Sequence, residues 1–253
     1  MTAASVIRLA LIVLALASPG ALAQTPPGET PKAPAPPLVE PALPADVAFA
    51  RNIAIIRADL LMADALVKER DWVDARPHVN FPREEIYGAI RGDLKTYKTP
   101  QFDGALRDLA HAVAARSIKL YDRASMKVQA ALAAADVGLQ ARQKDWPRFT
   151  LQVAAAALAD AADEYDDAVA NGRVRATGYQ SARGIVFESD RMIEAVAKDV
   201  AARSSDALQA IRGNLMRLKD VFASVTAPKE PRADVASIRA LVAQTAALMR
   251  GVR

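Results

Sequence analysis

Residues 147–172, PRFTLQVAAAALADAADEYDDAVANG, contain the pattern that decides the fold. Apolar residues recur in this stretch at helical spacing and so line one face of a helix. That face consists of Leu151, Ala155, Leu158, Ala162, Tyr165 and Val169. Pro147 is favourable in the first turn, where its missing N–H is not needed, and Asn171-Gly172 is favourable at the end. The stretch therefore predicts a helix that buries one face.

The same spacing continues on both sides of this stretch. Further apolar stripes run over 49–67, 86–97, 102–113, 128–139, 208–222 and 238–248. The region 182–222 contains no proline and fits either one long helix or two. Because stripes of alternating three and four spacing keep facing a neighbour when helices cross at a shallow angle, we expect an all-α bundle of about six to eight helices over residues 45–253. The bundle core explains each stripe without a cofactor site.

Composition supports this fold class and narrows the function. Hydrophobic residues make up 52% of the chain but aromatic residues only 5%, a balance that favours close-packed helices over sheets. The chain has no cysteine, which excludes thiol chemistry and cysteine metal sites. The formal net charge is only +4, with both signs interspersed, so a nucleic-acid partner is not expected.

Residues 1–44 predict export followed by a linker. Arg8, the apolar run 9–17 and the small residues around Ala23 have the order of a secretory signal peptide, which we expect over residues 1–23 with cleavage after Ala23. The apolar run is too short to span a bilayer, so no transmembrane segment is expected after cleavage. The expected location is the periplasm, and the alternative is full secretion. Residues 24–44 are rich in proline and predict a disordered linker, either a docking arm or an unconstrained terminus.

The two tryptophans suggest an internal helix-turn-helix duplication. Asp71-Trp72 and Asp145-Trp146 each follow a helical, basic stretch and each precede an acidic element that contains tyrosine. The residues in question are Trp72 with Tyr87 and Trp146 with Tyr165. Since Asp is a preferred N-cap and Trp covers apolar surface, we interpret these residues as structural, with each Asp capping the next helix.

Sequence motifs of known enzyme classes are absent. The chain has no Gly-x-Ser-x-Gly, no His-Glu-x-x-His, no Walker loop and no Gly-x-Gly-x-x-Gly motif. Asp108 and His111 have the spacing used in di-iron bundles, but the further carboxylates of such a site are missing and His111 lies opposite the stripe of its own helix. We therefore expect a salt-bridging surface histidine at position 111. No enzyme activity is expected.

A metal site is the sharper hypothesis for the remaining titratable residues. His78 is expected in a turn between Pro77 and Asn80, shortly before Glu84 and Glu85. An imidazole beside two carboxylates can bind a divalent or transition metal ion such as Zn, Cu(II), Fe or Mn. The alternative is an exposed loop histidine that precedes glutamates in the first turn of a helix.

A second acidic group lies where a helix disfavours it. Acidic residues crowd the last turns of the predicted helix, where the carbonyl end of the helix dipole repels negative charge. They are Asp160, Asp163, Glu164, Asp166 and Asp167. Compensation is expected from Arg173 and Arg175, from Arg183 and Arg191 of an adjacent helix, from a bound cation, or from a basic partner. In the metal hypothesis, Asp160, Asp163, Glu164 and Asp167 join His78, Glu84 and Glu85.

Around Trp72, residues 78–87, Trp146 and residues 163–165, the chain resembles uncharacterised exported helical proteins of proteobacteria. Its layout is remotely similar to that of imelysin-like proteins, a family associated with iron uptake, and this resemblance implies a periplasmic metal-handling bundle. The His-x-x-Glu metal motif of that family has no counterpart after His78 or His111, so no residue role is carried over.

Three functions remain from the sequence. The first is an exported helical bundle that binds a protein or cell-envelope component without catalysis. The second is a periplasmic metal-binding or metal-delivery protein. The third is an enzyme of unrecognised type, which requires a polar pocket that joins a histidine to a carboxylate with a perturbed pKa.

Overall fold

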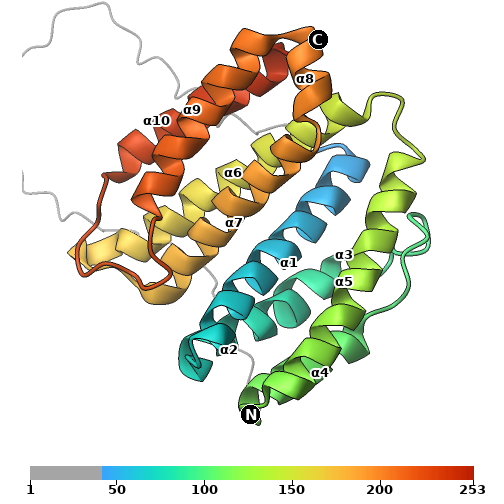
Figure 1. Cartoon of the computed structure of the whole chain (residues 1–253), viewed down its shortest axis with the longest axis vertical. Coiled ribbons are helices and arrows are strands. Elements are labelled where there is room, and N and C mark those ends of the chain that lie inside the picture. Colours follow the sequence, from blue (N-terminus) through green and yellow to red (C-terminus); the bar gives the residue numbers. More distant parts are fainter. Residues whose placement is uncertain (1–41) are drawn as a thin grey trace, which may run out of the picture. The chain divides into compact units, whose positions relative to one another are not determined.

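A computed structural model describes residues 42–253 and confirms the all-α fold (Figure 1). The signal peptide predicted over 1–23 and nearly all of the linker predicted over 24–44 lie outside the described residues. Within 42–253 there is no strand, and eight helices have ten residues or more. They are α1 (Ala45–Lys68), α2 (Trp72–Phe81), α4 (Asp103–Ala114), α5 (Ile118–Gln140), α6 (Trp146–Val169), α7 (Ala176–Ala195), α9 (Ser205–Val221) and α10 (Val235–Gly251).

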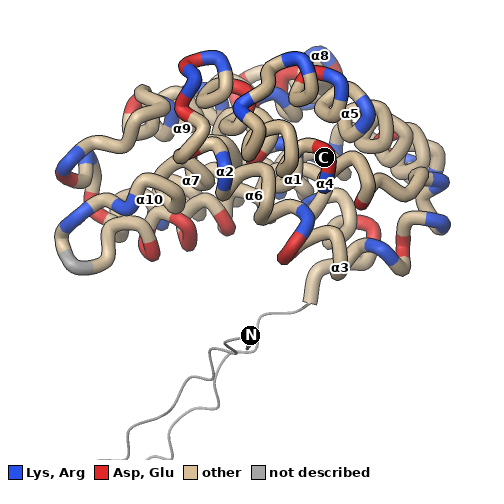
Figure 2. The backbone as a smooth tube through the Cα atoms, turned by 90° about the horizontal axis from the view of Figure 1, so that it is seen from below, with Lys and Arg blue, Asp and Glu red and all other residues tan. Residues whose placement is uncertain are grey.

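Four shorter segments complete the described helices. They are the π-helical turn η1 (Pro82–Ile86), α3 (Tyr87–Ile90), the 3₁₀ turn η2 (Ala170–Gly172) and α8 (Ala197–Arg203). In residues 42–253, no helix combines the length and the apolar character needed to cross a bilayer. Figure 2 shows basic and acidic residues interspersed over these elements, as the composition predicts.

Helix α6 follows the sequence prediction closely. Asp145 is its N-cap and accepts a hydrogen bond from the backbone N–H of Arg148, and Pro147 lies in the first turn. The helix ends at Val169 and is followed by η2, whose last residue Gly172 has a φ of 73°. A positive φ is accessible to glycine at no steric cost, which explains why the helix stops there.

The N-terminal helices α1, α2, α4 and α5 share one apolar core. Phe49 of α1 stacks on Tyr97 with ring centroids 4.0 Å apart, and Tyr87 packs edge-on against Phe102. The Tyr87 hydroxyl also accepts a hydrogen bond from the backbone N–H of Phe102. These contacts place Tyr87 in this core and join it to the residue that precedes α4.

The C-terminal helices α6, α7, α9 and α10 form a second core and lie together in Figure 1. Tyr165 of α6 packs edge-on against Phe222, and its hydroxyl donates a hydrogen bond of 2.6 Å to the carbonyl of Ala233. This bond fixes the segment before α10 against α6. Helix α1 joins the two groups, because it packs against α2 and α5 on one side and against α6 and α7 on the other.

The region 182–222 differs from both alternatives predicted for it, one helix or two. The structure divides it into the second half of α7, the short α8 and α9. Ser204 ends α8 with an extended backbone conformation and caps α9 by accepting a hydrogen bond from the N–H of Ala207. A serine at this position competes with the continuing helix, which explains the break in the absence of proline.

The two tryptophan units agree in their caps and differ in their packing. Asp71 accepts a hydrogen bond from the N–H of Asp74, as Asp145 does at α6, which confirms the predicted caps. Trp72 and Trp146 are both half-buried against the core. However, α2 packs against α1, whereas α6 packs mainly against α7, α10 and α1. The similarity of the two units is therefore limited to their local turns and does not extend to packing.

Candidate functional site

His78 lies inside α2 and is only 1% exposed, so the prediction of a turn at this position is wrong. The helix continues through Pro77 because Ala75, His78 and Val79 form a buried face that packs against neighbouring helices. The loss of one backbone hydrogen bond at Pro77 is offset by this burial. The alternative of an exposed loop histidine is equally wrong.

A chain of hydrogen bonds links His78 to α1 and α7. His78 Nδ1 lies 2.9 Å from Oδ1 of Asp59, and Nε2 lies 3.2 Å from Oε1 of Gln180. Gln180 in turn donates to Oδ2 of Asp74 at 3.3 Å. Asp59, His78 and Gln180 are all buried, so this chain is a polar element inside the core where α1, α2 and α7 meet.

The chain fixes the protons of the Asp59 and His78 pair. Oε1 of Gln180 can only accept a hydrogen bond, so Nε2 of His78 carries a proton. Nδ1 then shares a second proton with Asp59, because either the imidazolium donates to a carboxylate or a protonated Asp59 donates to His78. Both arrangements give the pair no net charge. Burial raises the pKa of Asp59, and the hydrogen bond and charge of His78 oppose that rise.

One oxygen of this pair has no partner. Oδ2 of Asp59 is buried and makes no hydrogen bond to any described residue, and the residue is only 3% exposed. A buried carboxylate oxygen without a partner costs free energy, since it has lost its hydration. Such an atom in a native structure requires an explanation.

Asp59 and His78 line a pocket of about 340 Å³. The other residues around it come from α2, η1, α6 and α7. They are Pro77, Asn80, Phe81, Glu84, Glu85, Glu164, Thr177 and Ser181. Glu84, Glu85 and Thr177 are exposed and form the mouth, whereas Asp59 and His78 form the buried end. The pocket is therefore acidic and passes from solvent to the interior of the bundle.

Glu164 is a second carboxylate of this pocket whose pKa is raised. Burial raises its pKa to about 7, and the nearby carboxylates of Asp59, Asp167 and Asp160 add to the rise, while Arg175 opposes it. No described residue forms an ion pair or a side-chain hydrogen bond with it. An acid held in this way favours a proton or a cation near its oxygens.

The structure brings together four of the seven residues of the predicted metal site and separates the other three. His78, Glu84, Glu85 and Glu164 line the pocket, whereas Asp160, Asp163 and Asp167 do not. Asp160 pairs with Arg51, and Asp163 pairs with Arg239. In residues 42–253, no three His, Cys, Asp or Glu side chains already converge closely enough to hold a metal ion.

The charge compensation at the end of α6 comes partly from unexpected residues. Arg239 of α10 pairs with both Asp163 and Asp166, and Arg51 of α1 pairs with Asp160. Arg175 donates to the backbone carbonyl of Asp167 at the helix end and forms no ion pair among the described residues, in contrast to the pairing predicted for it.

Arg183 and Arg191 do not take the role predicted for them. Arg183 donates to the carbonyl of Phe222, and Arg191 pairs with Glu188 on its own helix. Tertiary packing explains this difference, because α1 and α10 are the helices that run beside the acidic face of α6.

The sequence prediction missed Asp59 and Gln180. A signal for Asp59 was present, since it lies three residues after Ile56 and four before Ala63, on the buried face of the first helix. A charged residue at a position that the periodicity assigns to the core is a candidate for a buried polar site. No comparable signal identifies Gln180.

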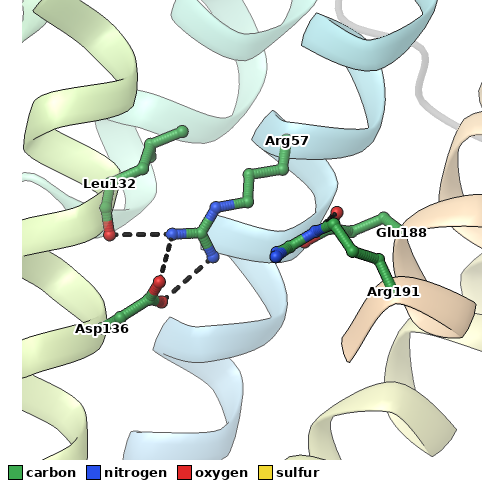
Figure 3. A network of polar contacts seen from close by, with 5 residues as sticks. All are labelled: Arg57, Leu132, Asp136, Glu188 and Arg191. Atoms are coloured by element: carbon green, nitrogen blue, oxygen red, sulfur yellow. Dashed lines mark hydrogen bonds and ion pairs between the residues drawn. The ribbon is translucent and has the colours of Figure 1, made fainter. Parts of the chain in front are cut away.

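A second polar network lies on the other side of α1 (Figure 3). Arg57 donates to both carboxylate oxygens of Asp136 and to the carbonyl of Leu132, so it ties α1 to α5. The neighbouring pair of Arg191 and Glu188 belongs to α7. These charges neutralise one another, which indicates a structural network.

His111 is exposed in α4, as predicted, and its neighbour Asp108 pairs with Lys127. No ion pair of His111 is found in the part of the chain that the structure describes, so the predicted salt bridge is not formed there. Asp108 and His111 are therefore surface residues.

The C-terminal helices are similar to a known protein family. Residues 140–252 match the model of a family described as the iron permease-associated 4-helix bundle domain. The matched range covers α6 to α10 and so coincides with the group of helices that shares the second core. Searches of curated proteins and of solved structures give no significant match. The match supports a link to a helical family, whereas the imelysin-like layout is not confirmed.

Proposed function

We propose that this chain is an exported, non-enzymatic component of an iron-permease system and that it acts by binding a protein of that system. The observation that carries the proposal is the match of residues 140–252 to an iron permease-associated domain. The match begins at the end of α5 and so covers α6, α7, α9 and α10, the helices that share the second core. A match that covers a whole group of packed helices supports the proposal better than a scattered similarity would.

The polar groups of the acidic pocket support a binding role over catalysis. Both ring nitrogens of His78 are engaged, by Asp59 and by Gln180, so the imidazole is not available as a base for the nearby hydroxyl of Ser181. General base catalysis needs a nitrogen within hydrogen-bond reach of the proton that is removed. The sequence pattern of a signal peptide over residues 1–23 supports the proposal of export.

Deletion of the gene in the native host tests the role in iron uptake. Under iron limitation we expect the deletion strain to take up less radioactive iron than the parent strain, with uptake of zinc unchanged as the control. The full chain supplied from a plasmid should restore the rate. An unchanged rate of iron uptake in the deletion strain would overturn the proposal.

Cross-linking in cells tests the partner. A tagged full chain should recover a permease or another component of the same transport system, as identified by mass spectrometry. A tagged exported protein of similar size serves as the control for chance capture. Fractionation of the same cells measures export directly, and recovery of the chain in the cytoplasm alone would contradict that part of the proposal.

A further inference from the structure

We infer that the acidic pocket at the junction of α1, α2, α6 and α7 binds a hard metal cation through the carboxylates of Asp59 and Glu164. This inference goes beyond the proposed function and stands on the pocket itself. The ligand class is a divalent or trivalent ion that prefers oxygen donors, such as Mn²⁺, Ca²⁺ or an iron ion.

The unpartnered oxygen of Asp59 is the first observation that supports the site. Its Oδ1 is held by His78 at 2.9 Å, while its buried Oδ2 has no described partner and the residue lines the pocket. Carboxylates that ligate metals are oriented by hydrogen bonds in the same way, with one oxygen fixed by a neighbour. His78 is therefore a positioning residue for Asp59.

The second observation is that the pocket has acids without basic partners. Asp160, Asp163 and Asp166 on α6 each pair with an arginine, whereas Glu164 on the same helix turn has none among the described residues. The side chains of Glu84 and Glu85 at the mouth likewise form no ion pair or hydrogen bond with a described residue. A cation would compensate this local excess of negative charge.

The oxygen donors decide the class of ion. His78 cannot ligate, because one ring nitrogen faces Asp59 and the other faces Gln180. Carboxylate and hydroxyl oxygens remain, with Thr177 and Ser181 beside the acids. Such a donor set suits hard ions, in contrast to the imidazole-containing set predicted from the sequence.

The site closes only when the ion binds. No three acidic or histidine side chains converge to ligand distance within residues 42–253, so at least one glutamate has to rotate inward. Glu84 and Glu85 are suited to this movement because both are exposed on η1. We expect an affinity in the range of about 10⁻⁵ to 10⁻⁴ M, because a site that must rearrange binds more weakly than a rigid one.

Titration of the full chain with Mn²⁺ tests the site, with electron paramagnetic resonance and calorimetry as readouts. The free-ion signal should fall with saturation at one ion per chain. Glu164→Gln should weaken binding at least about tenfold, which is the change expected for the loss of one charged ligand. The control is Asp163→Asn, one residue earlier on α6 and paired outside the pocket, which should leave binding unchanged.

Two further measurements keep the inference open to refutation. Asp59→Asn disturbs a buried pair and could prevent folding. The double variant Glu84→Gln and Glu85→Gln changes exposed positions, so it tests the pocket without a threat to folding. It should also weaken Mn²⁺ binding. Spin-echo spectra of bound Mn²⁺ should lack the coupling of a directly ligated imidazole nitrogen, and its presence would overturn the oxygen-only ligand set.

The remaining outcomes separate this inference from the proposed function. No saturable Mn²⁺ binding below about 1 mM, or an equal loss in Asp163→Asn and Glu164→Gln, would overturn the cation site. The purified chain could bind Mn²⁺ as expected while deletion of its gene leaves iron uptake unchanged. That combination would support the cation site and reject the role in an iron-permease system.

Discussion

Gly184 of α7 lies against the backbone of Ala58 in α1, so closely that a Cβ atom on Gly184 would be 2.6 Å from the carbonyl oxygen of Ala58. This contact sets the spacing of the two helices at the candidate site. Asp59 follows Ala58 directly, and Gln180 lies one helical turn before Gly184. The close crossing therefore holds Gln180 within reach of His78, the residue that binds Asp59.

Gly184→Ala should destabilise the protein by about 1–3 kcal/mol, because the new methyl group meets a backbone carbonyl that cannot rotate away. Chemical denaturation followed by circular dichroism measures the change. The matched control is Gly213→Ala in α9, where the added Cβ meets no atom within 4 Å and helix propensity should add about 0.5–1 kcal/mol. Equal effects of the two substitutions would contradict a close crossing.

Glu164→Gln should stabilise the protein at about pH 8 by on the order of 1 kcal/mol and make its stability less dependent on pH. Because the pKa of Glu164 is raised from 4.5 to about 7, the folded protein keeps a proton that the unfolded chain releases. This contribution is complete below the unfolded pKa and is lost as the pH rises through the folded value. Glutamine retains the uncharged form at every pH.

Thermal melting between about pH 5 and pH 8 checks this prediction. Asp163→Asn serves as the control, since Asp163 is exposed and paired with Arg239. If Glu164→Gln and the unmodified protein showed the same dependence of stability on pH, Glu164 would be ionised across this range in the folded protein.

Arg57→Ala should cost about 1–3 kcal/mol, because Asp136 and the carbonyl of Leu132 both lose a charged donor (Figure 3). The Arg57 side chain is only 18% exposed, so water replaces these bonds poorly. The control is Lys127→Ala on α5, whose ion pair with Asp108 of α4 is exposed and should contribute less than about 0.5 kcal/mol. Urea denaturation of both variants makes the comparison.

Asp71→Ala should cost about 1 kcal/mol through the loss of the α2 cap, whereas Asp71→Asn should be nearly neutral because asparagine also caps. At α6 the same pair of substitutions separates two roles of Asp145. Asp145→Asn keeps the cap but loses the charge that pairs with Arg203. The loss of stability in Asp145→Asn beyond that in Asp71→Asn therefore measures the ion pair of Asp145 with Arg203. Calorimetric melting of the four variants provides the values, and a neutral Asp71→Ala would contradict the capping role.

Local features of this protein were predictable because they depend on neighbours in the sequence. The extent of α1 and α6 follows from apolar residues at helical spacing, and both Asp caps follow from the preference of a short acidic side chain for exposed backbone amides. The same local reasoning was wrong at Pro77, where burial of the α2 face outweighs the proline. It also failed at Ser204, where a cap ends a helix without proline or glycine.

The sequence by itself determined the all-α class, most helix limits, the two Asp caps and the surface position of His111. Only the tertiary structure decided that His78 is buried, that Asp59 and Gln180 are its partners, and that Glu164 joins the pocket while Asp160 and Asp163 are neutralised by Arg51 and Arg239. The physical reason is the range of the interactions. Helical periodicity repeats within a few residues, whereas His78 of α2 and Gln180 of α7 are 102 residues apart and meet because both helices pack against α1.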